Sequence, residues 1–332
     1  MKIRSLVAPA NIGFLSPLRV GGAARAWLIF IMAFSLQLSA PWSQSAWAEQ
    51  HQNLPIIDLH LHLDPSWEMN KVLALLDRVG VVKAGQSPRG PDSVAITFAK
   101  ASDRFIPVAG DPLVGLVCPE RGGRGQDAWE LRADALLDYL GKLEAGLAAK
   151  SFKGIGELQL NRMPGSPNFL CRQPADSPLM RRLWGLSAKY RVPLFVHMDG
   201  SDDAIAEMER LLTSDRAGTW VWLHSGIFVE PPALRDLLRR HPNLYLELAH
   251  RGTVRTLPHS TTLDTKGVLR DDWKKLIEEF PERFLLGSDA PLSAYEDVIR
   301  FWRNITGQLT PPTAALFAHG NAQRLFGLTL SK

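Results

Sequence analysis

The sequence predicts an α/β protein built as a single (β/α)8 barrel, and three observations lead to that fold class. Eight short apolar runs are spaced along residues 56–287, and segments with helical periodicity separate them. The chain beyond its first 48 residues also has the size of such a barrel, which is typically about 250 residues. A doubly wound open sheet alternates strands and helices in the same way. However, no glycine-rich nucleotide-binding motif follows the first predicted strand, so the nucleotide-binding version of that fold has no support.

The predicted strands are rich in β-branched and other apolar residues, as strands usually are. In order, they span residues 56–63, 81–84, 104–109, 154–160, 192–198, 220–224, 244–249 and 284–287. The longer segments between them predict helices over residues 127–150, 177–190, 233–240, 271–280 and 295–302. Pro231 and Pro232 mark the start of the helix at 233–240, since proline is favoured in the first turn of a helix.

Three predicted connections are long, and they span residues 110–126, 161–176 and 251–267. Each of them follows a strand. In a (β/α)8 barrel such connections lie at the carboxyl-terminal face, where the active sites of this fold are built. Long ordered loops are usually functional. We therefore expect substrate specificity to depend on these loops, whose sequences contain no recognisable motif.

The first 48 residues differ in composition from the rest of the chain. They contain four basic residues and no acidic residue, and an apolar run spans residues 27–34. Ala46 and Ala48 provide the small side chains that a signal peptidase reads. The apolar run is shorter than the roughly 20 residues of a membrane-spanning helix. We therefore expect a cleaved signal peptide at residues 1–48, a single catalytic barrel at residues 49–332 and a periplasmic or secreted location. An uncleaved inner-membrane anchor is the alternative.

Charge and cysteine content limit the partners of the protein. The chain has 38 basic and 34 acidic residues, and the excess of four lies in the first 48 residues, so the remaining body is neutral. Because the body has no global cationic field, we expect a small-molecule substrate, no nucleic acid and no membrane contact beyond the leader. The oligomeric state stays open. Outside the cytoplasm Cys118 and Cys171 could form a disulfide, although two buried thiols fit the sequence equally well.

Histidines and carboxylates recur at the ends of the predicted strands. His60 and His62 lie two residues apart in the first strand, so their side chains project from the same face. Four further residues end or follow strands, namely Glu157, His197, His224 and Asp289. Charged side chains are rarely buried unless they are paired or bind a metal. Because all strand ends meet at one mouth of a barrel, the sequence predicts a site there for zinc, or for manganese, iron or nickel.

These residues give the chain its resemblance to the amidohydrolase superfamily of metal-dependent hydrolases. The matching segments are Asp58-Leu59-His60-Leu61-His62, the strand-end His197 and His224, Gly287-Ser288-Asp289-Ala290-Pro291, and Gly320-Asn321-Ala322-Gln323-Arg324-Leu325-Phe326. The last two are most similar to the amidohydrolase-related branch, which also holds metal-dependent decarboxylases. The resemblance covers residues 54–328, nearly the whole predicted barrel.

The resemblance implies a distorted (β/α)8 barrel with one or two divalent ions. His60, His62 and Asp289 would hold the first ion, and His197, with His224 in two-metal members, would hold the second. In one-metal members His197 joins the first site and His224 polarises the substrate. Gly156-Glu157 is similar to the strand in which a glutamate of TatD-like hydrolases bridges two ions, but the residues after it depart from that pattern. No lysine ends the fourth strand, so a carbamylated-lysine bridge has no support there.

The implied reaction is attack of a metal-activated water on an amide, ester or lactone bond. The pKa of water falls from about 15.7 toward about 7 beside a divalent cation, and Asp289 would accept the proton and deliver it to the leaving group. The metal or His224 would stabilise the developing oxyanion. His250 and Arg251 end the seventh predicted strand and are the candidate substrate contacts. Asp58 is expected to support the metal ligands.

Three other functions stay open at this point. A non-oxidative decarboxylase of the same branch would use one metal and would not require Glu157. A TatD-like nuclease is disfavoured by the neutral body, since phosphate binding needs local lysine and arginine. A barrel that has lost catalysis and only binds ligands is disfavoured because every expected metal ligand is present.

Overall fold

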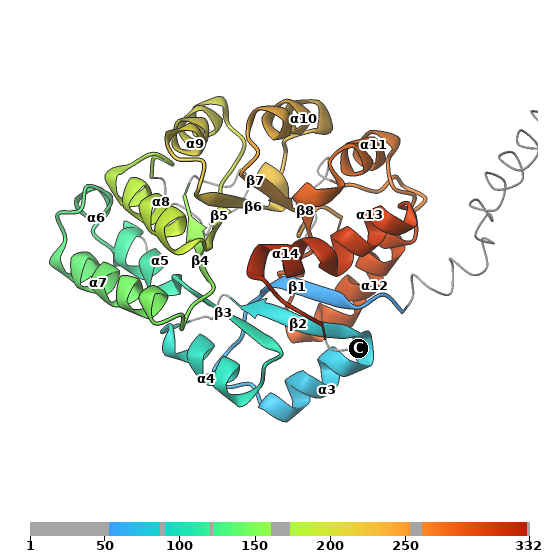
Figure 1. The fold of residues 1–332 in the computed structure, drawn as a ribbon, viewed down its shortest axis with the longest axis horizontal. Coiled ribbons are helices and arrows are strands. Elements are labelled where there is room, and N and C mark those ends of the chain that lie inside the picture. The colour runs from blue at the N-terminus through green and yellow to red at the C-terminus, as the bar shows by residue number, and fades with distance from the viewer. Residues whose placement is uncertain (1–52, 87–89, 120–121, 161–172, 253–260, 331–332) are drawn as a thin grey trace, which may run out of the picture. The chain divides into compact units, whose positions relative to one another are not determined.

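An eight-stranded parallel barrel forms the centre of the computed structural model, which describes residues 53–86, 90–119, 122–160, 173–252 and 261–330. Its strands are β1 (Ile56–Leu61), β2 (Val81–Gln86), β3 (Phe105–Ala109), β4 (Gly154–Gln159), β5 (Pro193–His197), β6 (Thr219–Leu223), β7 (Leu244–Glu247) and β8 (Phe284–Leu285). Each strand pairs with the next one along the chain. The ring closes where Leu59 N donates to Leu286 O at 2.9 Å and Asp289 N donates to His60 O at 2.7 Å. The predicted (β/α)8 barrel is confirmed (Figure 1).

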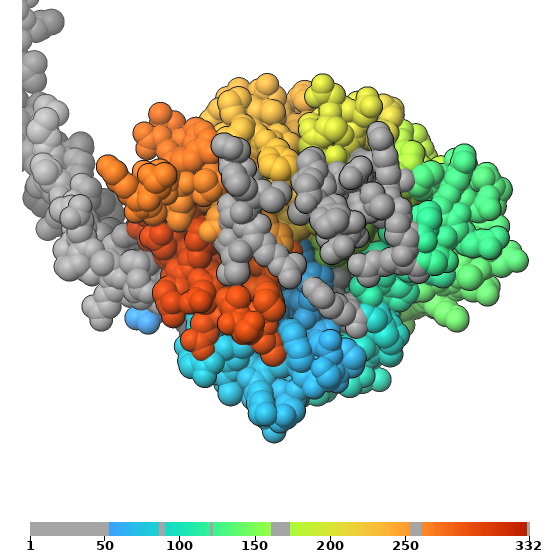
Figure 2. Space-filling view, turned by 180° about the vertical axis from the view of Figure 1, so that it is seen from behind, coloured from blue at the N-terminus to red at the C-terminus, as the bar shows by residue number. Residues whose placement is uncertain are grey.

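Helices surround the barrel in chain order. They are α3 (Met69–Val79), α4 (Ser93–Ala101), α5 (Asp111–Val117), α6 (Gln126–Trp129), α7 (Asp134–Ala148), α8 (Pro178–Tyr190), α9 (Asp202–Ser214), α10 (Pro231–Arg240), α11 (Asp271–Glu279), α12 (Tyr295–Thr306), α13 (Pro311–Ala315) and α14 (Asn321–Phe326). Figure 2 shows the opposite face from Figure 1, and the chain colours follow one another around its rim from blue through green and yellow to orange.

Local sequence explains where these helices begin. Ser177 caps α8, because its side-chain oxygen accepts the backbone N–H of Met180 at 3.3 Å, and Pro178 occupies the first turn. Leu179 and Leu183 recur on the buried face of α8 with helical spacing. α10 begins at Pro231 as the sequence predicts.

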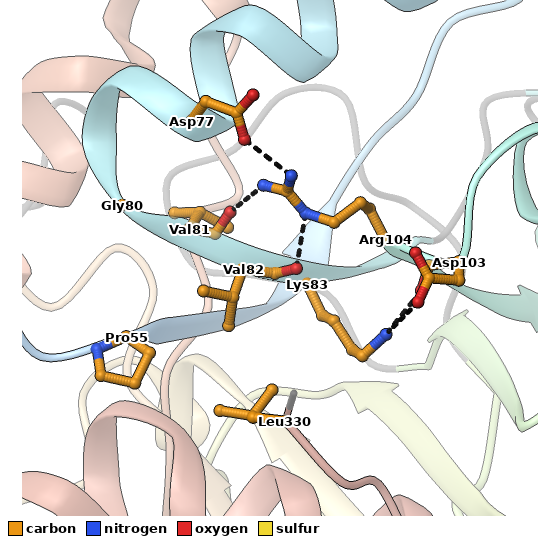
Figure 3. A pocket seen from close by; sticks show the side chains of 9 residues that line it. All are labelled: Pro55, Asp77, Gly80, Val81, Val82, Lys83, Asp103, Arg104 and Leu330. Atoms are coloured by element: carbon orange, nitrogen blue, oxygen red, sulfur yellow. Dashed lines mark hydrogen bonds and ion pairs between the residues drawn. The ribbon is translucent and has the colours of Figure 1, made fainter. Parts of the chain in front are cut away.

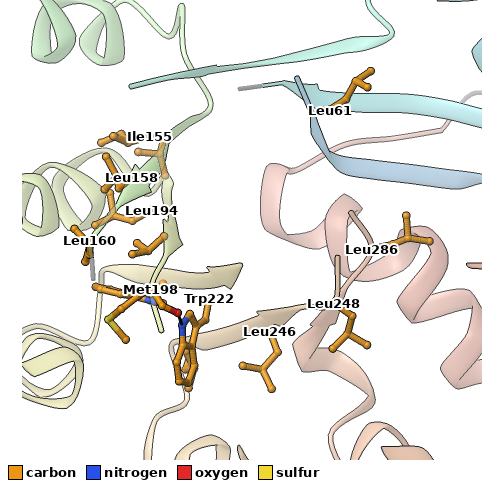
Figure 4. Packing of buried hydrophobic residues seen from close by; sticks show 14 of the residues in the cluster. Leu61, Ile155, Leu158, Leu160, Leu194, Met198, Trp222, Leu246, Leu248 and Leu286 are labelled. Carbon is orange, nitrogen blue, oxygen red and sulfur yellow. Dashed lines mark hydrogen bonds between the residues drawn. The ribbon is translucent and has the colours of Figure 1, made fainter. Parts of the chain in front are cut away.

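The main hydrophobic core lies between the strands and the surrounding helices. Figure 4 shows part of this layer, with buried side chains of β4, β5, β6 and β7 packed side by side. Trp222 is fully buried there, and its indole N–H donates to Met198 O at 2.8 Å. That bond satisfies a polar group that would otherwise be costly to bury.

A second cluster fills the barrel itself. It contains Ile57, Ile106, Val108, Phe195, Val221 and Leu285, together with residues near the carboxyl terminus. Phe326 of α14 stacks on Phe195 with ring centroids 6.3 Å apart and nearly parallel planes. The carboxyl-terminal segment therefore closes the amino-terminal end of the barrel, and the opposite end is left for the strand-end residues.

One predicted helix and one predicted long connection differ in detail from the observed structure. The helix expected over residues 127–150 is interrupted, since Leu131 adopts a left-handed conformation with φ 58° between α6 and α7. The connection expected at 110–126 follows β3 and contains the short helix α5. The connection expected at 161–176 lies mostly outside the described residues, as does part of the one at 251–267.

Other predictions concern parts of the chain that the structure describes incompletely. The predicted signal peptide at residues 1–48 and Cys171 lie outside the described residues. Cys118 is buried and disulfide-bonded, and the sequence contains one other cysteine. Among the described residues, no helix has the length and apolar character needed to span a bilayer.

Candidate metal centre

The strand ends bring six predicted residues to one place inside the carboxyl-terminal mouth of the barrel. His60 and His62 come from the end of β1, Glu157 from β4, and His197 from the last position of β5. His224 directly follows β6, and Asp289 lies four residues beyond the end of β8. Four of the six are buried, and His62 and Asp289 are partly buried. The convergence that the sequence predicts is therefore present.

One half of this cluster surrounds the two histidines of β1. The Nε2 atoms of His60 and His62 lie 3.2 Å apart. Glu157 Oε2 lies 3.2 Å and Asp289 Oδ1 lies 3.1 Å from Nε2 of His62. Two ring nitrogens and two carboxylate oxygens thus point at a common centre, which we call the first subsite.

The other half surrounds the histidine that ends β5 and the one that follows β6. His197 Nδ1 lies 2.7 Å from Glu157 Oε1 and 3.1 Å from Nε2 of His224. We call this group the second subsite. Glu157 belongs to both, because its Oε2 faces the first subsite and its Oε1 faces the second.

The donor atoms fit a bound divalent metal. Three sets each place three possible ligand atoms within 4.8 Å of one another, namely His60, His62 and Glu157; His60, His224 and Asp289; and Glu157, His197 and His224. Imidazole nitrogen with carboxylate oxygen is a donor set that suits zinc and several first-row transition metals. The close approach of ring nitrogens within each subsite also requires a positive charge or a proton between them.

Burial and mutual charge shift the pKa values of this cluster. Burial alone lowers the pKa of His62, but hydrogen bonds with Asp289 and Glu157 and their charges raise it to about 9. Burial raises the pKa of Glu157, yet its hydrogen bonds with His197, His224 and His60 hold it well below the usual range. Asp289 shows the same balance, with the charge of His60 and a hydrogen bond from His250 lowering its pKa. Without a metal, the carboxylates are therefore ionised.

His224 differs from the histidines of β1. Burial is the largest cause that lowers its pKa, to about 4, so the ring is neutral at pH 7. Its Nδ1 lies 3.1 Å from Ala249 O, and a carbonyl oxygen can only accept a hydrogen bond. The proton therefore resides on Nδ1, and Nε2 presents a lone pair to the second subsite.

Glu247 is a buried carboxylate that the sequence analysis missed. Its Oε2 lies 3.4 Å from Nδ1 of His60 and accepts the backbone N–H of His224 at 3.2 Å, and its Oε1 accepts the N–H of Ala249 at 2.5 Å. A Cβ atom at position 287 would collide with this carboxylate, so Gly287 leaves room for it. The signal was present in the sequence, because Glu247 is an acidic residue within the apolar β7 strand.

Asp58 joins β1 to the segment that follows β8, as the expected supporting role requires. It accepts hydrogen bonds from the backbone N–H of His60 at 3.0 Å and of Ser288 at 2.9 Å. The hydroxyls of Ser288 and Tyr295 donate to its other oxygen at 2.7 and 2.8 Å. Burial raises the pKa of Asp58, and these bonds oppose that rise.

The two candidate substrate contacts lie in different environments. His250 Nε2 contacts Asp289 Oδ2, at the edge of the cluster. Arg251 is fully buried, and its guanidinium donates to the carbonyl oxygens of His224, Ser225 and Val229. A side chain with no exposed surface and these backbone partners does not fit the predicted substrate contact, so that role is withdrawn for Arg251.

A cavity of about 410 Å³ lies at the amino-terminal ends of β1, β2 and β3, away from the cluster. Figure 3 shows that its charged side chains pair with one another and with the backbone. Arg104 donates to Asp77 and to the carbonyl oxygens of Val81 and Val82, and Lys83 donates to Asp103. The charged side chains of this cavity are therefore already paired, and they do not form a group of reactive side chains.

A (β/α)8 barrel with histidines and carboxylates gathered at the carboxyl ends of its strands defines a class of metal-dependent enzymes. The chain belongs to the Amidohydrolase family, whose model matches residues 57–328. No curated protein matches the sequence.

Solved structures with the same fold are distant in sequence. An uncharacterized TIM-barrel protein from Bordetella bronchiseptica is 17% identical with a TM-score of 0.53, over 86% of this chain and 90% of that one. Dihydroxybenzoic acid decarboxylase from a Polaromonas species, with bound manganese and the inhibitor 2-nitroresorcinol, is 13% identical with a TM-score of 0.53, over 83% and 98% of the chains. Dihydroorotase from Campylobacter jejuni is 14% identical with a TM-score of 0.52, over 84% and 85% of the chains.

Proposed function

We propose that this protein is a hydrolase that uses two divalent metal ions to cleave an amide, ester or lactone bond of a small molecule. The observation that carries the proposal is the placement of Glu157, whose two carboxylate oxygens face separate pairs of histidines. A carboxylate in that position can bridge two ions. His60, His62 and Asp289 would hold one ion with Glu157, and His197 and His224 would hold the other. Zinc is the first candidate, and manganese, iron and nickel suit the same donors.

The metal, when bound, would supply Lewis acidity that lowers the pKa of water and polarises a carbonyl group. Asp289 is placed to move the proton, since its Oδ1 faces His62 while its Oδ2 contacts His250. Its carboxylate would accept the proton of the attacking water and return it to the leaving group. His250 would orient that carboxylate through its contact with Oδ2. Its Nδ1 is buried and has no hydrogen-bond partner in the described part of the chain, so the support for Asp289 comes through Nε2.

Non-oxidative decarboxylation is the second candidate reaction. Among the similar structures are decarboxylases that act on dihydroxybenzoates, and one of them holds manganese. One metal would serve such a reaction, and a bridging carboxylate would not be needed. We favour hydrolysis because Glu157 is buried between both subsites.

We also propose that the protein acts outside the cytoplasm after removal of residues 1–48. The disulfide at Cys118 supports this location, since structural disulfides persist in oxidising compartments and are rare in the cytosol.

Metal stoichiometry tests the two-metal proposal. We expect about two equivalents per chain by elemental mass spectrometry, and a loss of about one equivalent in Glu157→Gln, because the amide is a poor bridging ligand. Glu144→Gln is the matched control, since Glu144 pairs with Arg182 and Lys189 on the surface and should leave the content unchanged. One equivalent that is insensitive to Glu157 would contradict the proposal. A parallel screen of lactones, esters, amides and aromatic carboxylates, with carbon dioxide detection, separates the two reactions.

A further inference from the structure

The turn after β6 has an unusual backbone for residues that carry side chains. His224, Ser225, Gly226 and Ile227 have φ values of 58°, 47°, 68° and 60°. Residues other than glycine rarely adopt this left-handed region, because Cβ crowds the backbone. Such a turn persists only where the surrounding structure holds it in place. His224 is a proposed metal ligand, so whatever holds the turn also sets the position of its ring.

Arg251 contacts this turn from the segment that follows β7. Its Nε donates to His224 O at 3.0 Å, and its Nη2 donates to Ser225 O and to Val229 O, each at 2.7 Å. The guanidinium also lies over the Trp273 ring, with Cζ 5.0 Å from the centroid. Burial is the largest cause that lowers its pKa, to about 9, so the side chain stays charged at neutral pH. A buried cation is costly unless hydrogen bonds compensate it, and here two of the acceptors, His224 O and Ser225 O, belong to this turn.

The same short segment fixes the remaining polar groups of His224. Glu247 accepts its backbone N–H at 3.2 Å, and Ala249 O accepts from its ring Nδ1 at 3.1 Å. Arg251 binds its carbonyl oxygen. The position of Nε2, which faces His197 and Glu157, therefore depends on residues 247–251. The first subsite shares Glu247 and His250 of this segment, which face His60 and Asp289, but it also has a support of its own, because Asp58 ties the His60 backbone to Ser288. The described hydrogen bonds of Arg251 itself go to residues 224, 225 and 229 and not to the first subsite.

We propose that Arg251 is a positioning residue for the second metal subsite, and that it sets the metal affinity of this subsite without setting that of the first. The inference rests on the proposed two-metal function. It assigns Arg251 a specific role in place of the substrate contact that the sequence suggested.

The test is a stepwise zinc titration of the full chain against a competing chelator, with the variants Arg251→Met and Arg251→Lys. Methionine keeps the apolar stem and removes the hydrogen bonds to His224 O, Ser225 O and Val229 O. We expect the affinity for the second equivalent to fall about 10- to 100-fold, as is typical when partners that orient metal ligands are lost, and the affinity for the first equivalent to change less than about twofold. Arg251→Lys keeps the charge, but a single ammonium group cannot reproduce the arrangement of the guanidinium Nε and Nη2 donors. We therefore expect an intermediate loss of affinity for the second equivalent.

Arg283 offers a matched control at the other end of the barrel. Its guanidinium also donates to carbonyl oxygens, those of Leu244 and His241, and lies over the Tyr245 ring. Arg283→Met should lower the unfolding temperature while leaving both metal affinities unchanged. If Arg251→Met weakened both subsites equally or neither, or if Arg283→Met also weakened the second, the inference would be overturned.

Two outcomes separate this inference from the proposed function. A wild-type chain that binds only one equivalent would contradict the two-metal function and the inference with it. A wild-type chain that binds two equivalents, with Arg251→Met and Arg251→Lys both unchanged, would contradict only the role of Arg251. If Arg251→Met does not fold, the lysine variant decides between the outcomes.

Discussion

The ring nitrogens of the metal centre are oriented by partners that lie outside it. Ala249 O accepts from Nδ1 of His224, and Glu247 faces Nδ1 of His60, so Nε2 of each ring points to the cluster. Partners of this kind fix the tautomer and orientation of metal-binding histidines and raise their affinity for metal. The ring orientations are thus set before any ion binds, which reduces the reorganisation that binding would require.

At the scale of single residues, a substitution of Asp289 tests the proposed proton transfer directly. We expect Asp289→Asn to lower kcat about 10²- to 10⁴-fold on the substrate that the screen identifies, because an amide cannot accept the proton of the attacking water. Steady-state kinetics on variant protein reloaded with metal measures this effect. Metal content must be determined in parallel, since Asp289 Oδ1 also faces the first subsite. A fully loaded variant with wild-type kcat would exclude Asp289 as the proton acceptor.

At the scale of elements, the strands and the main site residues could be predicted from the sequence. The residues that hold those site residues in position could not. Apolar runs mark buried strands, and polar residues at their ends stand out because the topology brings those ends together. Glu247 escaped notice because one acidic residue within a strand has no sequence partner, and its bonds to β1 and β6 exist only in the closed barrel. Arg251 was misread for the same reason, since its acceptors are backbone carbonyls that no sequence pattern records.

The contact between α11 and the start of α13 gives a stability prediction at the scale of elements. Glu278 of α11 accepts hydrogen bonds from Thr310 N and Oγ1 at 2.7 Å and from Thr313 Oγ1 at 2.5 Å, where α13 begins. Partial burial raises its pKa, but these bonds outweigh burial and lower it. Glu278→Gln should therefore reduce the free energy of unfolding by about 1–2 kcal/mol at pH 7 in chelated protein, measured by urea denaturation.

The pH dependence of that difference has a definite sign. A carboxyl group with a lowered pKa in the folded state stabilises the fold above its unfolded pKa and loses that effect as the pH falls through the folded pKa. The gap between wild type and Glu278→Gln should thus shrink below about pH 4.5. Glu282→Gln is the control, because its pair with Arg324 is solvent-exposed and should be worth less than about 1 kcal/mol. A gap that stays constant from pH 7 to pH 3 would contradict this account.

At the scale of the molecule, the metal centre links parts of the barrel that are far apart in the chain. Its proposed ligands lie in β1, β4 and β5 or within four residues of the ends of β1, β6 and β8. An ion that binds this arrangement only in the folded state stabilises the whole barrel by mass action, by about 2.7 kcal/mol at a free concentration 100 times the Kd. Removal of metal with a chelator should therefore lower the Tm, and added zinc should restore it.

This stabilisation should also grow with pH, because protons compete with the metal. In the metal-free chain burial lowers the pKa of His62, but Asp289 and Glu157 raise it to about 9, so the ring carries a proton at pH 7 that metal binding must displace. We expect the rise in Tm on adding zinc at a fixed free concentration to be larger at pH 8 than at pH 6, by scanning calorimetry with a metal buffer. The chelated chain measured over the same range corrects for other titrating groups such as Glu278. A zinc-dependent shift that is equal at both pH values would mean that His62 does not give up a proton to the metal.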